Sequence, residues 1–152
     1  MLRRTICTLL VSGIFLLPAF AQKQEVKLPN SVGGRPFSAG IIAGDTLYVS
    51  GMVGRTADGK IPDSFEDEVK QTLDNINDVV KAAGYTIADA VSVQVYLTDM
   101  SLFERMNKIY TPYFPEPRPT RTTVGVTKLV GTSKIEITLT ASKASAGKKK
   151  KK

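Results

Sequence analysis

Hydrophobic and polar residues alternate along five short stretches of the chain, and alternation with a period of two is typical of β-strands with one buried face. The stretches predicted as strands are residues 37–43, 46–50, 91–97, 118–126 and 134–140. Gly44 and Asp45 separate the first two stretches and predict a tight hairpin turn. Gly51 is expected to end the second strand.

A longer period marks a helix that begins after Ser64. Asp67 follows this serine at the spacing of a capping box. Apolar residues then recur every three or four positions, which places them on one helical face: Phe65, Val69, Leu73, Ile76, Val80 and Ala83. Gly84 comes directly after the last of them and predicts the end of the helix.

A second helix is predicted after residues 98–101, because Leu102, Met106 and Ile109 share one helical face. The predicted order of elements is therefore β-β-α-β-α-β-β. This order indicates an α+β fold in which two helices cover one face of a mixed sheet. The polar residues of the last strand, such as Glu136 and Thr138, leave a second face that is either solvated or packed against another subunit.

The chain divides into four segments by composition. A basic start, an apolar run and an Ala-x-Ala ending predict a signal peptide over residues 1–21, with a retained membrane anchor as the alternative. Residues 22–30 are a linker or irregular arm, and residues 31–142 form one domain. Residues 143–152 are expected to be a disordered, lysine-rich tail.

Charge and composition exclude several classes of function. The net charge is +7, but seven of the 21 basic residues lie at Arg3, Arg4 and residues 148–152, which leaves 14 basic and 14 acidic residues in between. No basic stripe typical of nucleic-acid binding is visible. The chain has no His, and Cys7 lies in the predicted signal peptide. Thiolate and imidazole catalysis and Cys/His zinc sites are thereby excluded from the domain.

Arg121 and Glu136 are the charged pair in the predicted strands that is best suited to take part in a reaction. Thr122 and Val124 are expected to face the helices, so both charges are predicted to point out of the hydrophobic layer. The residues alone leave open an exposed salt bridge between the two strands, worth less than about 1 kcal/mol.

Several sequence blocks, in this order and spacing, resemble the reactive intermediate deaminase (Rid) family, also called the YjgF or endoribonuclease L-PSP family. The resemblance covers roughly residues 30–142, and its blocks are residues 48–51, 72–76, 82–84, 96–99, 118–123 and 134–137. It implies a chorismate-mutase-like fold and a homotrimer with ligand clefts between neighbouring subunits.

The resemblance also implies roles for individual residues. Arg121 matches an arginine that grips a substrate carboxylate, and Thr123 matches a residue whose backbone N–H meets the same group. Glu136 matches the acid that holds a water together with the backbone around Gly51. Three further positions match residues that line the pocket: Ser50, Asn107 and Phe37. Phe37 stands where many members have Tyr, and Thr138 where many have Glu.

The activity implied by the resemblance is hydrolysis of 2-enamino or 2-imino acids to 2-keto acids and ammonia, without metal or cofactor. With the predicted signal peptide, the protein is expected to be exported, periplasmic or secreted, and to have no membrane span after cleavage. One alternative is a non-catalytic module that binds small carboxylates in the same clefts. Another is a nucleic-acid or protein-protecting partner, although no specific nucleic acid is expected.

Overall fold

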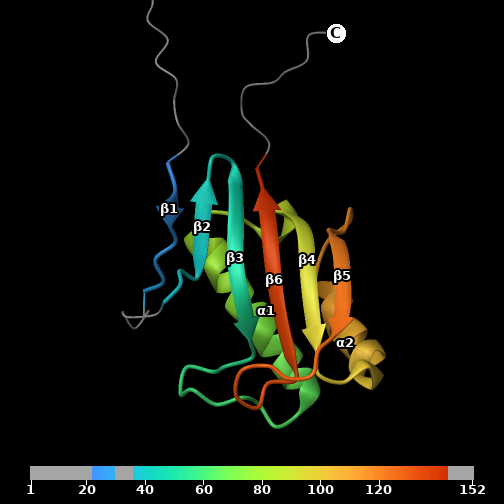
Figure 1. The fold of residues 1–152 in the computed structure, drawn as a ribbon. Helices are drawn as coiled ribbons and strands as arrows, with labels where there is room; N and C mark the ends of the chain where they lie inside the picture. The colour runs from blue at the N-terminus through green and yellow to red at the C-terminus, as the bar shows by residue number, and fades with distance from the viewer. Residues whose placement is uncertain (1–21, 30–35, 144–152) are drawn as a thin grey trace, which may run out of the picture.

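The computed structural model describes residues 22–29 and 36–143 of the chain, so the predicted signal peptide and the five terminal lysines lie outside it. Within these ranges no helix is both long and apolar enough to cross a membrane. Along the chain (Figure 1) the elements are β1 (Gln24–Glu25), β2 (Gly40–Ala43), β3 (Thr46–Val53), α1 (Phe65–Ala82), η1 (Ile87–Asp89), β4 (Ala90–Leu97), η2 (Met100–Leu102), α2 (Phe103–Tyr110), η3 (Thr111–Tyr113), β5 (Thr120–Gly125) and β6 (Ile135–Ser142).

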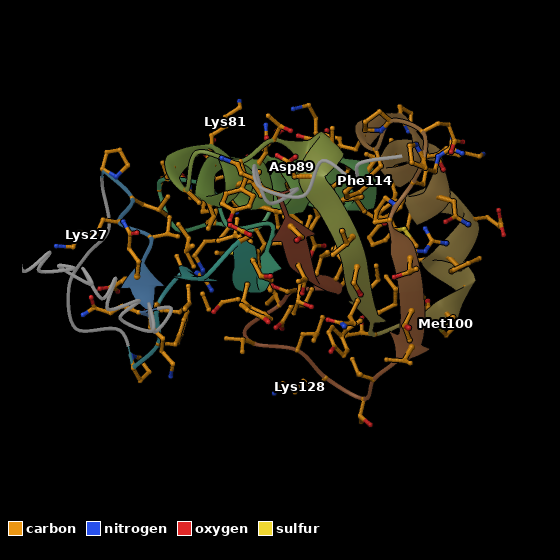
Figure 2. All side chains as sticks on the ribbon, turned by 90° about the horizontal axis from the view of Figure 1, so that it is seen from above. Lys27, Lys81, Asp89, Met100, Phe114 and Lys128 are labelled. Atoms are coloured by element: carbon orange, nitrogen blue, oxygen red, sulfur yellow. The ribbon has the colours of Figure 1, made fainter. Side chains whose placement is uncertain are left out.

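The strands form one mixed sheet in the order β1-β2-β3-β6-β4-β5, and only β4 and β5 run parallel to each other. Both helices cover the same face of this sheet (Figure 1). Seen from above, α1 lies on one side of the sheet and the loop carrying Lys128 on the other (Figure 2). The predicted α+β fold is confirmed, with β1 added by the N-terminal arm.

The hairpin of β2 and β3 turns at Gly44, whose φ of 60° suits glycine. The prediction that β3 ends at Gly51 was wrong. The strand continues to Val53, and its register against β6 shifts between Val49 and Met52. A β-bulge of this kind bends a strand locally and keeps it in the sheet.

Helix α1 begins and ends where the sequence predicts. The Ser64 hydroxyl accepts a hydrogen bond from the backbone N–H of Asp67 at 3.1 Å, which satisfies one free donor of the first turn. Gly84 follows the helix with a φ of 76°. The apolar face between these ends packs against β3 and β6, which makes α1 the main cover of the core.

Strand β4 lies between β6 and the edge strand β5. Three of its side chains are fully buried: Val93, Val95 and Leu97. Val91 was expected on the same face, but it is 46% exposed. The register of β4 against β6 shifts between Ala90 and Ser92, so the alternation is interrupted at this residue.

Glu68 connects α1 to the start of β6 from inside the core. Its side chain is fully buried, and Oε1 accepts hydrogen bonds from the backbone N–H groups of Lys134 at 2.7 Å and Ile135 at 3.4 Å. Its Oε2 has no hydrogen-bond partner among the described residues. Burial raises the pKa of this carboxyl despite those hydrogen bonds.

Candidate functional site

Strand β4 separates the two strands that carry Arg121 and Glu136. Arg121 on β5 pairs with Val93, whereas Glu136 on β6 pairs with Tyr96 on the other side of β4. Neighbouring strands are about 4.8 Å apart, so the two residues lie roughly 10 Å apart across the sheet alone. A direct salt bridge between neighbouring strands is therefore wrong for this chain.

Arg121 faces the helices, contrary to the prediction that it points out of the hydrophobic layer. It shares a face with its partner Val93, which is fully buried. Thr122 and Val124 point the other way, and Val124 is 41% exposed. β5 is an edge strand, and the Arg121 side chain on it lies over aromatic rings of α2.

The surroundings of Arg121 form what we call the arginine cluster, made of Phe103, Met106, Asn107, Tyr110, Arg121 and Thr123. The guanidinium carbon lies 4.6 Å from the centre of the Tyr110 ring and 5.4 Å from that of Phe103. Nη1 lies 4.0 Å from the sulfur of Met106. These contacts hold a cation on polarisable, uncharged groups.

Three buried polar atoms of the arginine cluster have no hydrogen-bond partner among the described residues. They are Asn107 Oδ1, Tyr110 Oη and Thr123 Oγ1. Such atoms are rare in folded proteins, and each calls for an explanation such as a water, an ion or a catalytic role. Burial also raises the pKa of Tyr110 to about 12, although the charge of Arg121 and the closeness of its N–H groups to the phenol oppose this shift.

Arg121 is half-buried and has no carboxylate within 4.0 Å in the described part of the chain. Arg105 on the same helix layer shows the contrast. Its Nε and Nη2 donate to the two carboxylate oxygens of Glu66 at 2.7 and 2.8 Å, which lowers the pKa of Glu66 to about 2. The donors of Arg105 are thus used within the fold, while those of Arg121 are available to an external anion.

Glu136 lies on the opposite face of the sheet, as predicted, and its carboxylate rests against Gly51. A Cβ atom added at Gly51 would lie 2.9 Å from Cδ of Glu136 and would overlap with Oε1. Only a residue without a side chain leaves room for this position. The bulge in β3 brings Gly51 to this place.

Ser50 precedes Gly51 on β3 and contacts the segment that follows Phe37. The Ser50 hydroxyl donates to the backbone oxygen of Ser38 at 2.7 Å, and its N–H donates to that of Ala39 at 3.0 Å. Phe37, next to Ser38, is 54% exposed. We call Phe37, Ser50, Gly51 and Glu136 the glutamate cluster.

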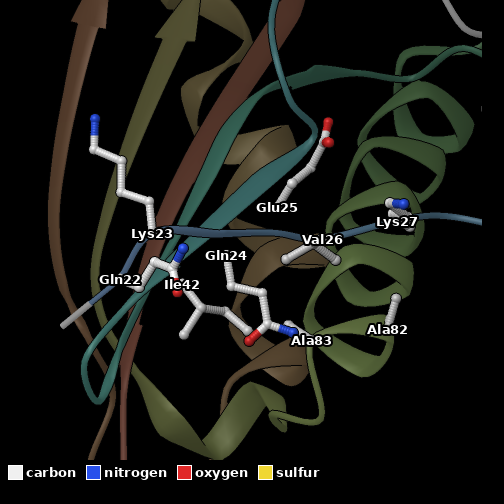
Figure 3. Close-up of a pocket in the computed structure, with 9 residues that line it drawn as sticks. All are labelled: Gln22, Lys23, Gln24, Glu25, Val26, Lys27, Ile42, Ala82 and Ala83. Atoms are coloured by element: carbon white, nitrogen blue, oxygen red, sulfur yellow. The ribbon is translucent and has the colours of Figure 1, made fainter.

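One chain therefore divides the seven predicted site residues between two clusters, and Arg121 and Glu136 lie on opposite faces of the sheet. A groove beside the first strand of the chain belongs to neither cluster. It has a volume of about 680 Å³ and lies between β1 and the end of α1 (Figure 3), lined by Gln22, Lys23, Gln24, Glu25, Val26, Lys27, Ile42, Ala82 and Ala83. No predicted site residue lines it.

The family of the chain follows from comparison with known proteins. The sequence profile described as Endoribonuclease L-PSP matches residues 29–143, which is most of the chain. The chain belongs to this family. It is the Rid family, and the arrangement of two helices on a mixed sheet is the fold of its members.

Two relatives and one solved structure illustrate the similarity. Reactive Intermediate Deaminase A of Arabidopsis thaliana is 36% identical over 78% of this Rid chain and 66% of its own length. The 2-iminobutanoate/2-iminopropanoate deaminase of Dermatophagoides farinae is 31% identical over 72% of this chain and 85% of its own length. The crystal structure of E. coli TdcF with bound serine is 28% identical, with a TM-score of 0.72 over 80% of this chain and 99% of that one.

The aromatic residues beneath Arg121 of this Rid protein were not predicted from its sequence. Phe103 and Tyr110 are seven residues apart, which is close to two helical turns and places them on one side of α2. That spacing is visible in the sequence. The parallel pairing of β5 with β4, which sets Arg121 above this side of the helix, is not.

Proposed function

We propose that the chain is an exported deaminase that hydrolyses reactive 2-enamino or 2-imino acids to 2-keto acids and ammonia. Membership of the Rid family supports the reaction, because two relatives are named as deaminases and one of them for 2-iminobutanoate and 2-iminopropanoate. An enamine enters the same reaction after its tautomerisation to an imine.

The observation that carries this proposal is a half-buried arginine whose donors have no acidic partner among the described residues. In the proposed site Arg121 binds the substrate carboxylate through two parallel N–H groups, a geometry that lysine lacks. The backbone N–H of Thr123 adds a third donor, and Asn107 lines the pocket. The serine bound in the TdcF structure carries a carboxylate and is comparable in size to the proposed 2-imino acid substrates.

Glu136 is proposed to handle water and protons at the C=N carbon. Its carboxylate takes a proton from a water whose oxygen bonds to this carbon, and then returns the proton to the nitrogen. A second proton passes from the newly formed hydroxyl group to the nitrogen as the C–N bond breaks, which gives the 2-keto acid and ammonia, so that one imine and one water are consumed. General acid–base catalysis of this type contributes about 10²–10⁴-fold to the rate. Gly51 leaves room for the carboxylate, and Ser50 and Phe37 line this side.

Arg121 and Glu136 of one chain lie on opposite faces of its sheet, and no small substrate reaches both. We therefore place the site between copies, with the arginine cluster of one subunit facing the glutamate cluster of the next. A cyclic assembly repeats such a head-to-tail contact until the ring closes. The homotrimer implied by the family resemblance provides three equivalent clefts of this kind.

Ammonia release from freshly generated 2-iminopropionate tests the reaction. Arg121→Ala should reduce kcat/KM at least about 100-fold, because it removes a charge-assisted bidentate contact. Arg118→Ala is the matched control, since Arg118 is exposed and already paired with Glu116. A folded Arg121→Ala variant with wild-type activity would refute the proposal.

The half-buried Arg121 also supports a second candidate, a non-catalytic module that binds small carboxylates in the same clefts. Calorimetry with 2-ketobutyrate and benzoate separates the two. Binding that is lost in Arg121→Ala, together with no ammonia release above the uncatalysed rate, would favour the binding module. Failure of the wild-type protein to bind either compound would contradict both candidates.

Export is proposed from the first 21 residues, whose composition is that of a signal peptide. We place the mature protein in the periplasm or outside the cell, without a membrane span. Mass spectrometry of the protein recovered from a secreting host should show Gln22 as the first residue. A chain that keeps residues 1–21 and sediments with membranes would support the alternative, a retained anchor.

A further inference from the structure

Arg105 lies on α2, and Arg121 of β5 contacts the rings of α2. The two guanidinium groups are held in different ways. Arg105 stacks on Phe65 at 5.5 Å, but its direction is fixed by the two oxygens of Glu66. Arg121 has no such acid among the described residues, and its nearest ring is Tyr110 at 4.6 Å. Something other than a salt bridge must therefore hold the Arg121 guanidinium in place.

Tyr110 is suited to this task because it is rigid, buried and uncharged. Only 4% of the residue is exposed, and its ring packs 4.6 Å from that of Phe114. With its pKa raised to about 12, the phenol stays neutral at physiological pH. A neutral ring attracts the guanidinium through its face without occupying the N–H groups at the guanidinium edge. Those groups remain free for a carboxylate.

We propose that Tyr110 is the positioning residue of the carboxylate site. Its ring face fixes the plane and direction of the Arg121 guanidinium before the ligand arrives, so that less side-chain freedom is lost on binding. The ring carries this role. The hydroxyl lies close enough to Arg121 for that side chain to lower its pKa, but it makes no hydrogen bond of normal geometry within the described residues, so the role is not assigned to it. The inference rests on the proposed function only in taking the ligand to be a small carboxylate.

The test compares two substitutions of the same residue. Tyr110→Phe keeps the ring, and Tyr110→Leu keeps bulk but removes the aromatic face. Calorimetry of the full assembly with 2-ketobutyrate, which does not react, should show Kd within about twofold of wild type for the first and about tenfold weaker for the second. The matched control is Tyr113→Leu. Tyr113 lies in η3, packs 6.4 Å from Phe114 and hydrogen-bonds to Asp74, whereas the rings over which Arg121 lies are Phe103 and Tyr110.

Kinetics and spectroscopy separate positioning from a merely structural role. With 2-iminopropionate, Tyr110→Leu should raise KM about tenfold and leave kcat within about twofold, as expected when uniform binding is lost. The Nε–H NMR signal of Arg121, assigned with Arg121→Lys, should show a ring-current shift in the wild-type protein and in Tyr110→Phe. This signal is measured on the wild-type protein and on Tyr110→Phe. The test therefore still applies if Tyr110→Leu folds poorly.

The outcomes distinguish this inference from the proposed function. If Arg121→Ala still binds 2-ketobutyrate, the proposed carboxylate site is wrong. If Arg121→Ala abolishes binding while Tyr110→Leu leaves Kd within about twofold, the site stands and the role of Tyr110 is refuted. An Nε–H signal of Arg121 without a ring-current shift would refute it as well, and so would a Tyr110→Phe variant as weak as Tyr110→Leu.

Discussion

The carboxylate of Glu136 occupies the space that a side chain at Gly51 would fill. A Cβ at this glycine would lie 2.9 Å from Cδ and 3.3 Å from Cγ of the glutamate. The two residues belong to neighbouring strands, and the shift in register between Val49 and Met52 brings them to this contact. The bulge of β3 thus sets the position of the proposed catalytic acid.

We expect Gly51→Ala to displace Glu136 and to reduce kcat/KM for 2-iminopropionate by about 100-fold, the lower range of acid–base catalysis. Crowding in the sheet should also lower the free energy of unfolding by about 1–3 kcal/mol. Ammonia release and urea unfolding measure the two effects. Gly125→Ala is the control, because its Cβ would meet only the flexible Met100 side chain, at 3.0 Å. An active Gly51→Ala enzyme would rule out this placement of Glu136.

Mixing two inactive variants should restore activity if the site is shared between copies. Arg121→Ala and Glu136→Gln each remove one side of every cleft. When the two are unfolded together and refolded at equal concentrations, about one quarter of the clefts should combine an intact arginine with an intact glutamate. The same treatment of wild-type protein gives the reference rate. A mixture as inactive as its components, despite subunit exchange seen by native mass spectrometry, would contradict the shared site.

Glu68 should make the stability of the protein depend on pH. Burial raises its pKa above the ordinary value of 4.5, so the folded state binds the proton more readily than the unfolded state. The free energy of unfolding should therefore fall as pH rises above about 4.5. Glu68→Gln keeps the acceptor for Lys134 without the charge, and should reduce the difference between pH 5 and pH 8.

Urea unfolding at a fixed protein concentration measures this difference. Glu68→Ala serves as the comparison, since it removes the hydrogen bond and leaves a cavity, and should cost about 2–4 kcal/mol at both pH values. An unchanged pH dependence in Glu68→Gln would show that another group is responsible.

The pair of Arg105 and Glu66 gives a pH effect of the opposite sign. The hydrogen bonds from Arg105 lower the pKa of Glu66 to about 2, so the stability from this pair is present above pH 4.5 and is lost as pH falls toward 2. NMR titration of the Glu66 carboxyl should show this value, and Arg105→Ala should return it toward 4.5. Arg118→Ala should leave the titration unchanged, because Arg118 pairs with Glu116.

The sequence by itself determined the class of fold and the limits of helix α1. Both rest on local physics: the period of the apolar residues, the capping serine Ser64, and Gly84 with its positive φ. The blocks that resemble the Rid family also identified Arg121 and Glu136 as the residues of interest. These features depend on neighbours along the chain, so they are readable without coordinates.

Only the tertiary structure decided where the charged residues face. Strand order and register arise from contacts between distant segments, so the insertion of β4 between β5 and β6 leaves no mark on either strand's own pattern. The alternation of Thr122 and Val124 predicted the wrong face for Arg121. The pattern of apolar residues in β5 does not show that the rings of α2 can accept a cation on the helix side. The fold thereby separates Arg121 from Glu136 within one chain, and this separation is the physical reason to propose a site built from two.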